Sequence, residues 1–360
     1  MKKIGILTFH RAINYGSHLQ TYALQKTISE LGAACEVVDY ICPCITRDYQ
    51  PFVIRREQPL ISFAKSCVMF RRRAKKAKSF ESFQNRIVKS AESYTPETLA
   101  KANDCYDLFV TGSDQVFSPG CAGFDPAYFL TFADDSKKYS YAASFATREI
   151  PEDKRAEFVR RLSGFQRISV REEEGIRHVK DLCGKTAEVS VDPTMLLCAE
   201  EWEKLAVDPE EEPYILVYSL MREKGPLKFA RKLAKEKNMK VICLHDAPHM
   251  PYRGVKFVRA ASVEAFLGYF KNASYVVSNS FHASVFSVIF HRSMFIEFAR
   301  PSGRNIRAES LLNALGIHRE LAGGNAVETP IDWEDVERRL AALREKSMAY
   351  LKEIVSSSEH

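Results

Sequence analysis

Paired cysteines and long apolar runs are what this sequence lacks. Its nine cysteines include no Cys-x-x-Cys pair, and their scattered positions favour reduced thiols over a disulfide framework or a zinc site. No stretch approaches the roughly 18 apolar residues of a membrane helix. The apolar run at residues 4–9 is shorter than that of a signal peptide and ends in His10 and Arg11. We therefore expect a soluble, cytoplasmic protein without a metal centre.

Three common enzyme motifs are also missing. The loop after the first apolar run contains no Gly-x-Gly-x-x-Gly, which argues against an NAD or FAD domain. The sequence has no P-loop and no Gly-x-Ser-x-Gly elbow, so neither a P-loop enzyme nor a serine hydrolase of the elbow type is expected. Internal repeats and low-complexity tracts are absent as well.

The composition is that of an ordinary globular protein of two domains. The chain has 360 residues, of which 46% are hydrophobic and 27% are charged. Lys and Arg number 52 against 46 Asp and Glu, a formal charge of +6. This mild excess suits an anionic small substrate and does not require nucleic acid, so we expect no nucleic-acid partner.

The opening of the chain predicts a parallel α/β sheet. A short apolar strand at residues 3–9, a helix with one buried face at 17–31 and a second strand at 36–40 follow one another within forty residues. Further strands are predicted at residues 108–111, 138–143, 167–170, 188–191, 214–219, 240–244, 275–278 and 294–298, with helices at 152–162 and 200–206.

These elements predict two Rossmann-like domains and a C-terminal helix. The N-terminal domain comprises residues 1–197, with a basic helical insertion at about 55–92, and the C-terminal domain comprises 198–330, with the acidic segment 208–213 near the join. Residues 331–360 form a last helix, capped by Asp332, that we expect to pack back across both domains.

The insertion carries a strongly basic segment. Residues 71–78 contain six Lys or Arg and no acidic residue, among apolar neighbours that include Phe63 and Phe70. Three interpretations remain open: a solvated helix face, contact with an anionic acceptor, and peripheral contact with an anionic membrane surface.

The candidate site residues follow predicted strands. Ligands of open parallel sheets bind beyond the carboxyl ends of the strands, where the loops converge. We therefore expect catalytic or substrate-binding roles for the polar and small residues of these loops, which are Asn14, Tyr15, Gly16, Gly112, Ser113, Asp114, Gln115, Arg171, Glu172, Asn279, Ser280, Phe281 and His282.

Each loop also has a structural interpretation. Asn14 and Gly16 either form a turn and helix cap or hold an anion at a helix N-terminus, and Asp114 either caps the next segment or serves the site. Arg171 offers a planar fork for a carboxylate or phosphate, unless it pairs with one of the glutamates at 172–174. His282 is either a buried core histidine or a neutral imidazole poised for proton transfer.

Several of these segments, in order, resemble one family. The sequence is similar to the polysaccharide pyruvyl transferases over about residues 4–315. The segments that carry the resemblance are Ile4-Gly5-Ile6-Leu7-Thr8-Phe9-His10, Asn14-Tyr15-Gly16, Leu19-Gln20-Thr21-Tyr22-Ala23-Leu24, Thr111-Gly112-Ser113-Asp114-Gln115-Val116, Tyr141-Ala142-Ala143-Ser144-Phe145, Ser169-Val170-Arg171-Glu172, Val191-Asp192-Pro193-Thr194 and Asn279-Ser280-Phe281-His282.

The resemblance implies a GT-B-like fold of two Rossmann-like domains facing a cleft. It implies transfer of pyruvate from phosphoenolpyruvate to a sugar diol of a cell-surface polysaccharide precursor, free or lipid-linked, with formation of a cyclic ketal and no further cofactor. Arg171 then corresponds to an arginine that holds the donor's anionic groups, and His282 to the proton donor. Asp114 stands at a motif position suited to activating the acceptor hydroxyl.

One position departs from the family pattern. Some ketal-forming members resemble Arg-Leu-His where this chain has Ser280-Phe281-His282, so one expected cation is missing. The arginines that could replace it are Arg292, Arg304 and Arg307. A glycosyltransferase-like enzyme with a nucleotide-sugar donor and a non-catalytic family member are therefore kept as alternatives. For Arg171→Ala, we expect weaker donor binding and little loss of stability, since a strand-end arginine carries little core packing.

Overall fold

The computed structural model describes residues 1–49, 59–211, 213–219, 225–245, 252–298, 305–321 and 325–357. The Arg304 candidate lies outside these residues. The chain divides into two compact units. The first unit comprises Met1–Gln50, Gln84–Leu197 and Leu340–His360, and the second comprises Pro51–Phe83 and Cys198–Arg339.

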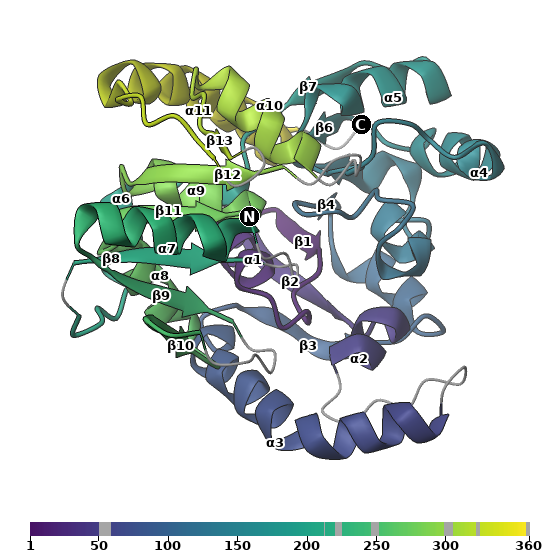
Figure 1. The fold of residues 1–360 in the computed structure, drawn as a ribbon. Helices are drawn as coiled ribbons and strands as arrows, with labels where there is room; N and C mark the ends of the chain where they lie inside the picture. The colour runs from purple at the N-terminus through teal and green to yellow at the C-terminus, as the bar shows by residue number, and fades with distance from the viewer. Residues whose placement is uncertain are drawn as a thin grey trace. The chain divides into compact units, whose positions relative to one another are not determined.

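The first unit is built on a five-stranded parallel sheet in the order β3-β2-β1-β4-β5 (Figure 1). Its strands are β1 (Lys3–Leu7), β2 (Ala34–Tyr40), β3 (Lys89–Tyr94), β4 (Leu108–Thr111) and β5 (Lys138–Ser140), followed by a two-stranded parallel pair, β6 (Ile168–Val170) and β7 (Ala187–Val189). Its α-helices and 3-10 helices are α1 (Tyr15–Glu30), α2 (Pro43–Tyr49), η1 (Leu99–Cys105), η2 (Ala122–Phe124), η3 (Pro126–Phe129), η4 (Asp135–Lys137), α4 (Glu152–Leu162), α5 (Glu173–Cys183) and η5 (Pro193–Met195). This order reverses between β1 and β4, which is where an open α/β sheet offers a ligand site.

The two faces of this sheet bury different cores. Because side chains alternate along a strand, Ile4 and Ile6 of β1 point to one face, where Leu24 of α1 and Leu351 pack on them. The opposite face holds an aromatic cluster from loops and helices, which includes Phe109, Phe117, Phe124, Phe129, Phe145, Phe158 and Phe165. Both faces are therefore covered, as expected for a parallel sheet.

The second unit repeats the architecture with a six-stranded parallel sheet in the order β10-β9-β8-β11-β12-β13. Its strands are β8 (Tyr214–Tyr218), β9 (Lys240–Leu244), β10 (Val255–Val258), β11 (Tyr275–Ser278), β12 (Ser293–Glu297) and β13 (Glu320–Leu321). Its helices are α3 (Pro59–Gln84), which reaches one residue beyond the unit, α6 (Ala199–Glu203), α7 (Gly225–Lys237), α8 (Val263–Lys271), α9 (Phe281–Ile289), α10 (Ile306–Ala314) and the start of α11 (Trp333–Ser356). The prediction of two Rossmann-like α/β sheets is confirmed.

The basic insertion differs from its prediction in two ways. The helix ends at Gln84, and Lys89–Tyr94 form strand β3 at the edge of the first sheet. This strand escaped prediction because its Lys-Ser-Ala-Glu-Ser-Tyr sequence is polar and largely exposed. The structure also groups Pro51–Phe83 with the second unit, whereas the sequence predicts that the insertion belongs to the N-terminal domain.

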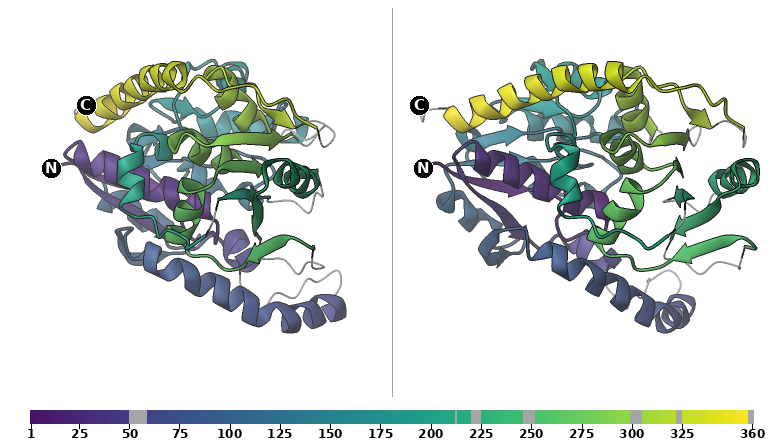
Figure 2. Two further views of the ribbon diagram at one scale, coloured as in Figure 1. Left: turned by 60° about the vertical axis from the view of Figure 1, so that its left-hand side comes forward. Right: turned by 90° about the vertical axis from the view of Figure 1, so that its left-hand side faces the viewer.

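The C-terminal helix α11 is long, and its residues are divided between the two units (Figure 2). Asp332 caps it, since its side chain accepts a hydrogen bond from the Asp335 N–H at 3.1 Å. From Leu340 onward the helix belongs to the first unit, where the Tyr350 hydroxyl donates to the Ser140 carbonyl at 2.8 Å. No helix in the described parts of the chain is long and apolar enough to cross a membrane.

Candidate functional site

The loop after β1 brings Asn14, Tyr15 and Gly16 to the N-terminus of α1. Asn14 is the N-cap of this helix, and its side chain accepts a hydrogen bond from the Ser17 N–H at 3.3 Å. Tyr15 and Gly16 form the buried first turn. The helix cap that the sequence allowed is therefore present, and it positions Ser17 to reach Asp114.

The loop after β4 is held by groups from β1 and α1. The Ser113 N–H donates to the Gln20 side chain at 3.1 Å, and the Thr8 hydroxyl donates to the Ser113 carbonyl at the same distance. Gly112 has a φ of +114°, and a Cβ there would lie 2.2 Å from the Tyr141 carbonyl oxygen, so only glycine fits. Asp114 also has a positive φ, of 72°. The backbone thus turns sharply where β4 ends.

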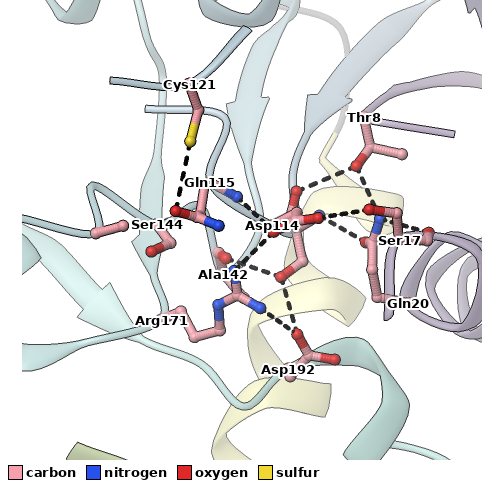
Figure 3. Close-up of polar contacts among 12 residues, drawn as sticks. Thr8, Ser17, Gln20, Asp114, Gln115, Cys121, Ala142, Ser144, Arg171 and Asp192 are labelled. Carbon is pink, nitrogen blue, oxygen red and sulfur yellow. Dashed lines mark hydrogen bonds and ion pairs between the residues drawn. The ribbon is translucent and has the colours of Figure 1, made fainter. Parts of the chain in front are cut away.

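Ser17, Asp114, Gln115, Arg171 and Asp192 form a polar cluster, the strand-end cluster, with Asp114 at its centre (Figure 3). One carboxylate oxygen accepts a hydrogen bond from the Ser17 hydroxyl at 2.8 Å. The other accepts one from the Gln115 N–H at 2.8 Å and lies 3.6 Å from the Arg171 guanidinium. The two loops that flank the reversal of strand order therefore meet at one carboxylate.

Arg171 lies between two carboxylates. It follows β6, and its Nη1 donates to Asp192 Oδ2 at 2.5 Å, while its Nη2 lies near Asp114. Asp192 is held in turn by the backbone N–H and the hydroxyl of Thr194, at 3.1 and 2.7 Å. The side chains of Arg171 and Asp192 are 2% and 0% exposed, so this is a buried ion-pair network.

This burial changes the expectation for Arg171. The premise that a strand-end arginine carries little packing is wrong, because Arg171 is 5% exposed overall and paired with a buried aspartate. Glu172, one of the partners that the sequence offered, does not pair with it. Its Oε1 accepts hydrogen bonds from the Ser144 hydroxyl at 2.9 Å and from the N–H groups of Phe145 and Ala146 at 2.8 and 3.0 Å.

A second buried network fixes the loop after β1. Asp39 accepts hydrogen bonds from His10 at 2.9 Å, from Arg11 at 2.9 and 2.6 Å and from Ser93 at 2.6 Å. Burial alone would raise the pKa of Asp39, but the hydrogen bonds from these three residues outweigh it and hold the pKa well below its usual range. The carboxylate therefore stays ionised and clamps the loop that leads to Asn14.

Gln115 is the last candidate of the first unit. The Gln115 side chain accepts a weak hydrogen bond from the Cys121 thiol at 3.5 Å.

Elsewhere, burial raises the pKa of the thiols of Cys42 and Cys243 to about 11 and about 12. Both stay protonated at neutral pH and are poor nucleophiles.

The second unit places Asn279, Ser280, Phe281 and His282 at the N-terminus of α9. Ser280 is the N-cap residue, but its side chain makes no capping hydrogen bond, and the first turn contains no acidic residue. Phe281 and His282 stack edge to face with ring centroids 5.1 Å apart, and His282 is 7% exposed. The positive end of the helix thus carries a buried imidazole.

Of the arginines that could replace the missing family arginine, Arg307 lies beside this helix start. Its guanidinium carbon is 5.5 Å from the centroid of the Phe281 ring. Arg292 is at the other end of α9, where its N–H donates to the Ser287 carbonyl at 2.7 Å. Tertiary structure therefore favours Arg307 over Arg292.

Two contributors were missed as site residues. Asp192 follows the strand predicted at 188–191, so the rule that selected the other strand-end loops could have selected it as well. Ser17 sits within the first turn of α1, and nothing in the sequence links it to Asp114, 97 positions away. Both enter the cluster through side chains that point toward the carboxyl ends of the strands (Figure 3).

Comparisons with solved structures support the fold. A putative UDP-N-acetylglucosamine 2-epimerase from Listeria monocytogenes is similar over 99% of this chain and 91% of its own, with 10% identity and a TM-score of 0.50. UDP-GlcNAc 2-epimerase from Neisseria meningitidis, bound to UDP-GlcNAc, gives 9% identity, coverages of 99% and 95%, and a TM-score of 0.48. E. coli heptosyltransferase WaaC with ADP-2-deoxy-2-fluoro heptose gives 12%, coverages of 83% and 90%, and 0.40. The first of these carries the argument and agrees with the GT-B-like fold predicted from the sequence.

Sequence comparison identifies the family. A search of curated proteins finds no match. The model of the family described as polysaccharide pyruvyl transferase matches residues 14–296. This stretch spans most of the chain and includes the loops after β4, β6 and β11. The chain therefore belongs to the polysaccharide pyruvyl transferase family.

Proposed function

We propose that this protein is a transferase that moves pyruvate from phosphoenolpyruvate to two hydroxyls of a sugar, as a cyclic ketal on a cell-surface polysaccharide precursor. Family membership supports the reaction class. The observation that carries the assignment of roles is the pairing of Arg171 with both Asp192 and Asp114.

This pairing argues against Arg171 as the main cation for the donor. An arginine between two carboxylates has its charge offset, and phosphoenolpyruvate brings a carboxylate and a phosphate. Such a cluster suits neutral hydroxyl groups better than an anion. We therefore assign the acceptor hydroxyls to the Asp114 cluster, with Arg171 and Asp192 as positioning residues.

The start of α9 is better suited to the donor's anionic groups. Its helix dipole favours negative charge, Ser280 leaves the first turn without a side-chain cap, and the Arg307 guanidinium lies beside Phe281. In this assignment Arg307 supplies the charge that the family arginine supplies elsewhere.

The chemistry needs one acid and one base. His282 donates a proton to the terminal carbon of the enol, so that positive charge develops at the central carbon. Asp114 accepts the proton of the first sugar hydroxyl as that oxygen attacks the central carbon. The second hydroxyl then attacks the same carbon as its C–O bond to phosphate breaks, and its proton leaves on the departing phosphate, which closes the ketal ring.

Calorimetric titration of the purified protein with phosphoenolpyruvate, UDP and GDP tests this proposal. We expect saturable binding of phosphoenolpyruvate, weakened about 10- to 100-fold in Arg307→Gln through loss of one charge-assisted contact. Arg292→Gln is the matched control, at the far end of the same helix, and should bind like wild type.

Two other results would contradict the proposal. Binding of UDP or GDP in place of phosphoenolpyruvate would support a glycosyltransferase with a nucleotide-sugar donor. Absence of binding to all three, with the protein folded, would support a non-catalytic member of the family.

A further inference from the structure

Helix α3 carries an exposed apolar stripe next to an exposed basic stripe. Phe63, Cys67 and Phe70 are exposed at spacings of four and three residues, which places them on one side of a helix. The phenylalanines are 50% and 47% exposed, unusual for such large apolar side chains.

The basic stripe has the same spacing. Arg71, Lys75 and Lys78 are all exposed and again follow one another at intervals of four and three. At 3.6 residues per turn this stripe is rotated by roughly 80° from the apolar one. The two stripes therefore form one continuous surface, which we call the α3 face.

The C-terminal end of α3 is anchored in the second unit. Phe80 and Phe83 are fully buried. The Ser79 hydroxyl donates to the Ala261 carbonyl at 3.2 Å, and the Ser82 hydroxyl donates to Glu264 at 3.1 Å. The C-terminal end of the helix is thus fixed by packing and hydrogen bonds, while the side chains of the α3 face remain exposed to solvent.

We propose that the α3 face docks the protein on an anionic membrane surface. The cations match the phosphate groups of anionic lipids, and the phenylalanine rings match the boundary between headgroups and acyl chains. Residues 71–78 contain six Lys or Arg and no acidic residue, so every charge in this segment is positive and complements an anionic surface. Among the described residues, Arg71, Lys75 and Lys78 make no ion pair that would offset it.

The apolar stripe is what selects a membrane over a polyanion in solution. A polyanion without aromatic groups would be attracted by the cations alone, whereas a lipid surface engages both stripes with one helix orientation. Docking would bring the chain to acceptors carried on lipid, but the inference does not depend on the identity of the donor.

Co-sedimentation of the full chain with lipid vesicles tests the inference. We expect binding to vesicles of phosphatidylcholine mixed with phosphatidylglycerol, weakened by salt, and little binding to phosphatidylcholine alone. Arg71→Glu/Lys75→Glu/Lys78→Glu should reduce affinity about a hundredfold, given roughly 1 kcal/mol for each cation near the surface. Phe63→Ser/Phe70→Ser should reduce it about tenfold.

Helix α7 provides a matched control. Lys228, Lys232 and Lys235 are exposed at the same spacing in the same unit, and no large apolar side chain of α7 is exposed. Lys228→Glu/Lys232→Glu/Lys235→Glu changes the net charge equally and should leave binding within about threefold of wild type. Circular dichroism and thermal unfolding verify that every variant is folded.

Three outcomes would contradict the inference, and these variants distinguish them. Equal losses in the α3 and α7 charge variants would mean that net charge alone drives binding. Unchanged binding of Phe63→Ser/Phe70→Ser would remove the membrane argument. Displacement of wild type from vesicles by single-stranded nucleic acid, with the same dependence on Phe63 and Phe70, would assign the face to nucleic acid. None of these outcomes bears on phosphoenolpyruvate binding, which the calorimetry measures.

Discussion

The two units share a strand order and differ in the loops that extend from equivalent strands. In each sheet the first and fourth strands of the unit lie side by side, β1 with β4 and β8 with β11. Beyond β1 and β4 the first unit has a dense cluster of carboxylates, hydroxyls and one buried arginine. Beyond β11 the second unit has a helix N-terminus with a histidine and a nearby arginine. The shared topology places the candidate residues of both units at the carboxyl ends of strands, and the loops decide which charged groups are found there.

Substituting Asp114 is the most direct test of the proposed difference between the two units. Asp114→Asn keeps the size of the side chain but removes the base, so we expect kcat to fall about 10²- to 10⁴-fold. Affinity for phosphoenolpyruvate, which we assign to the second unit, should change by less than about threefold. Steady-state kinetics together with calorimetry measure both. A loss of donor affinity as large as the loss of kcat would reject the division of roles.

Arg171→Ala should cost mainly stability. Removing the guanidinium leaves the buried carboxylate of Asp192 without its cation, and breaking a buried pair costs about 3–5 kcal/mol. Urea unfolding measures this free energy.

Two controls accompany the Arg171 variant. Arg160→Ala removes an exposed arginine of α4 and should cost less than about 1 kcal/mol. Adding Asp192→Asn to Arg171→Ala should restore part of the stability. Wild-type stability of Arg171→Ala with lost donor binding would instead return Arg171 to the role of donor ligand.

The ionised carboxylate of Asp39 should make the stability of the first unit depend on pH. Its pKa lies below the usual value in the folded chain, so the folded state binds fewer protons than the unfolded state in acid, and the stabilisation is present above about pH 4 and lost as pH falls further. We expect Asp39→Asn to lower the free energy of unfolding by about 2 kcal/mol at pH 7, with the difference from wild type shrinking toward pH 3. Denaturant unfolding across pH measures it, and a difference that is constant with pH would refute the ionic account.

The position of the candidate sites was predictable from local patterns. Apolar strands followed by short polar loops mark the carboxyl ends of a parallel sheet, and this rule found Asn14, Asp114, Arg171 and His282. Strand β3 was missed because an edge strand with a polar sequence buries too little to leave a pattern. The helix α3 was predicted, but its grouping with the second unit was not.

The fold class, the family and the position of the candidate loops could be predicted from the sequence alone, because strand periodicity, helix caps and ordered motifs are local features of the chain. Which charged and polar groups come into contact could be seen only in the folded chain. The hydrogen bond from Ser17 to Asp114 joins residues 97 positions apart, and that from Arg171 to Asp192 joins residues 21 apart. Such pairs depend on the order of strands in the sheet and on burial around each side chain, and these arise when distant segments pack.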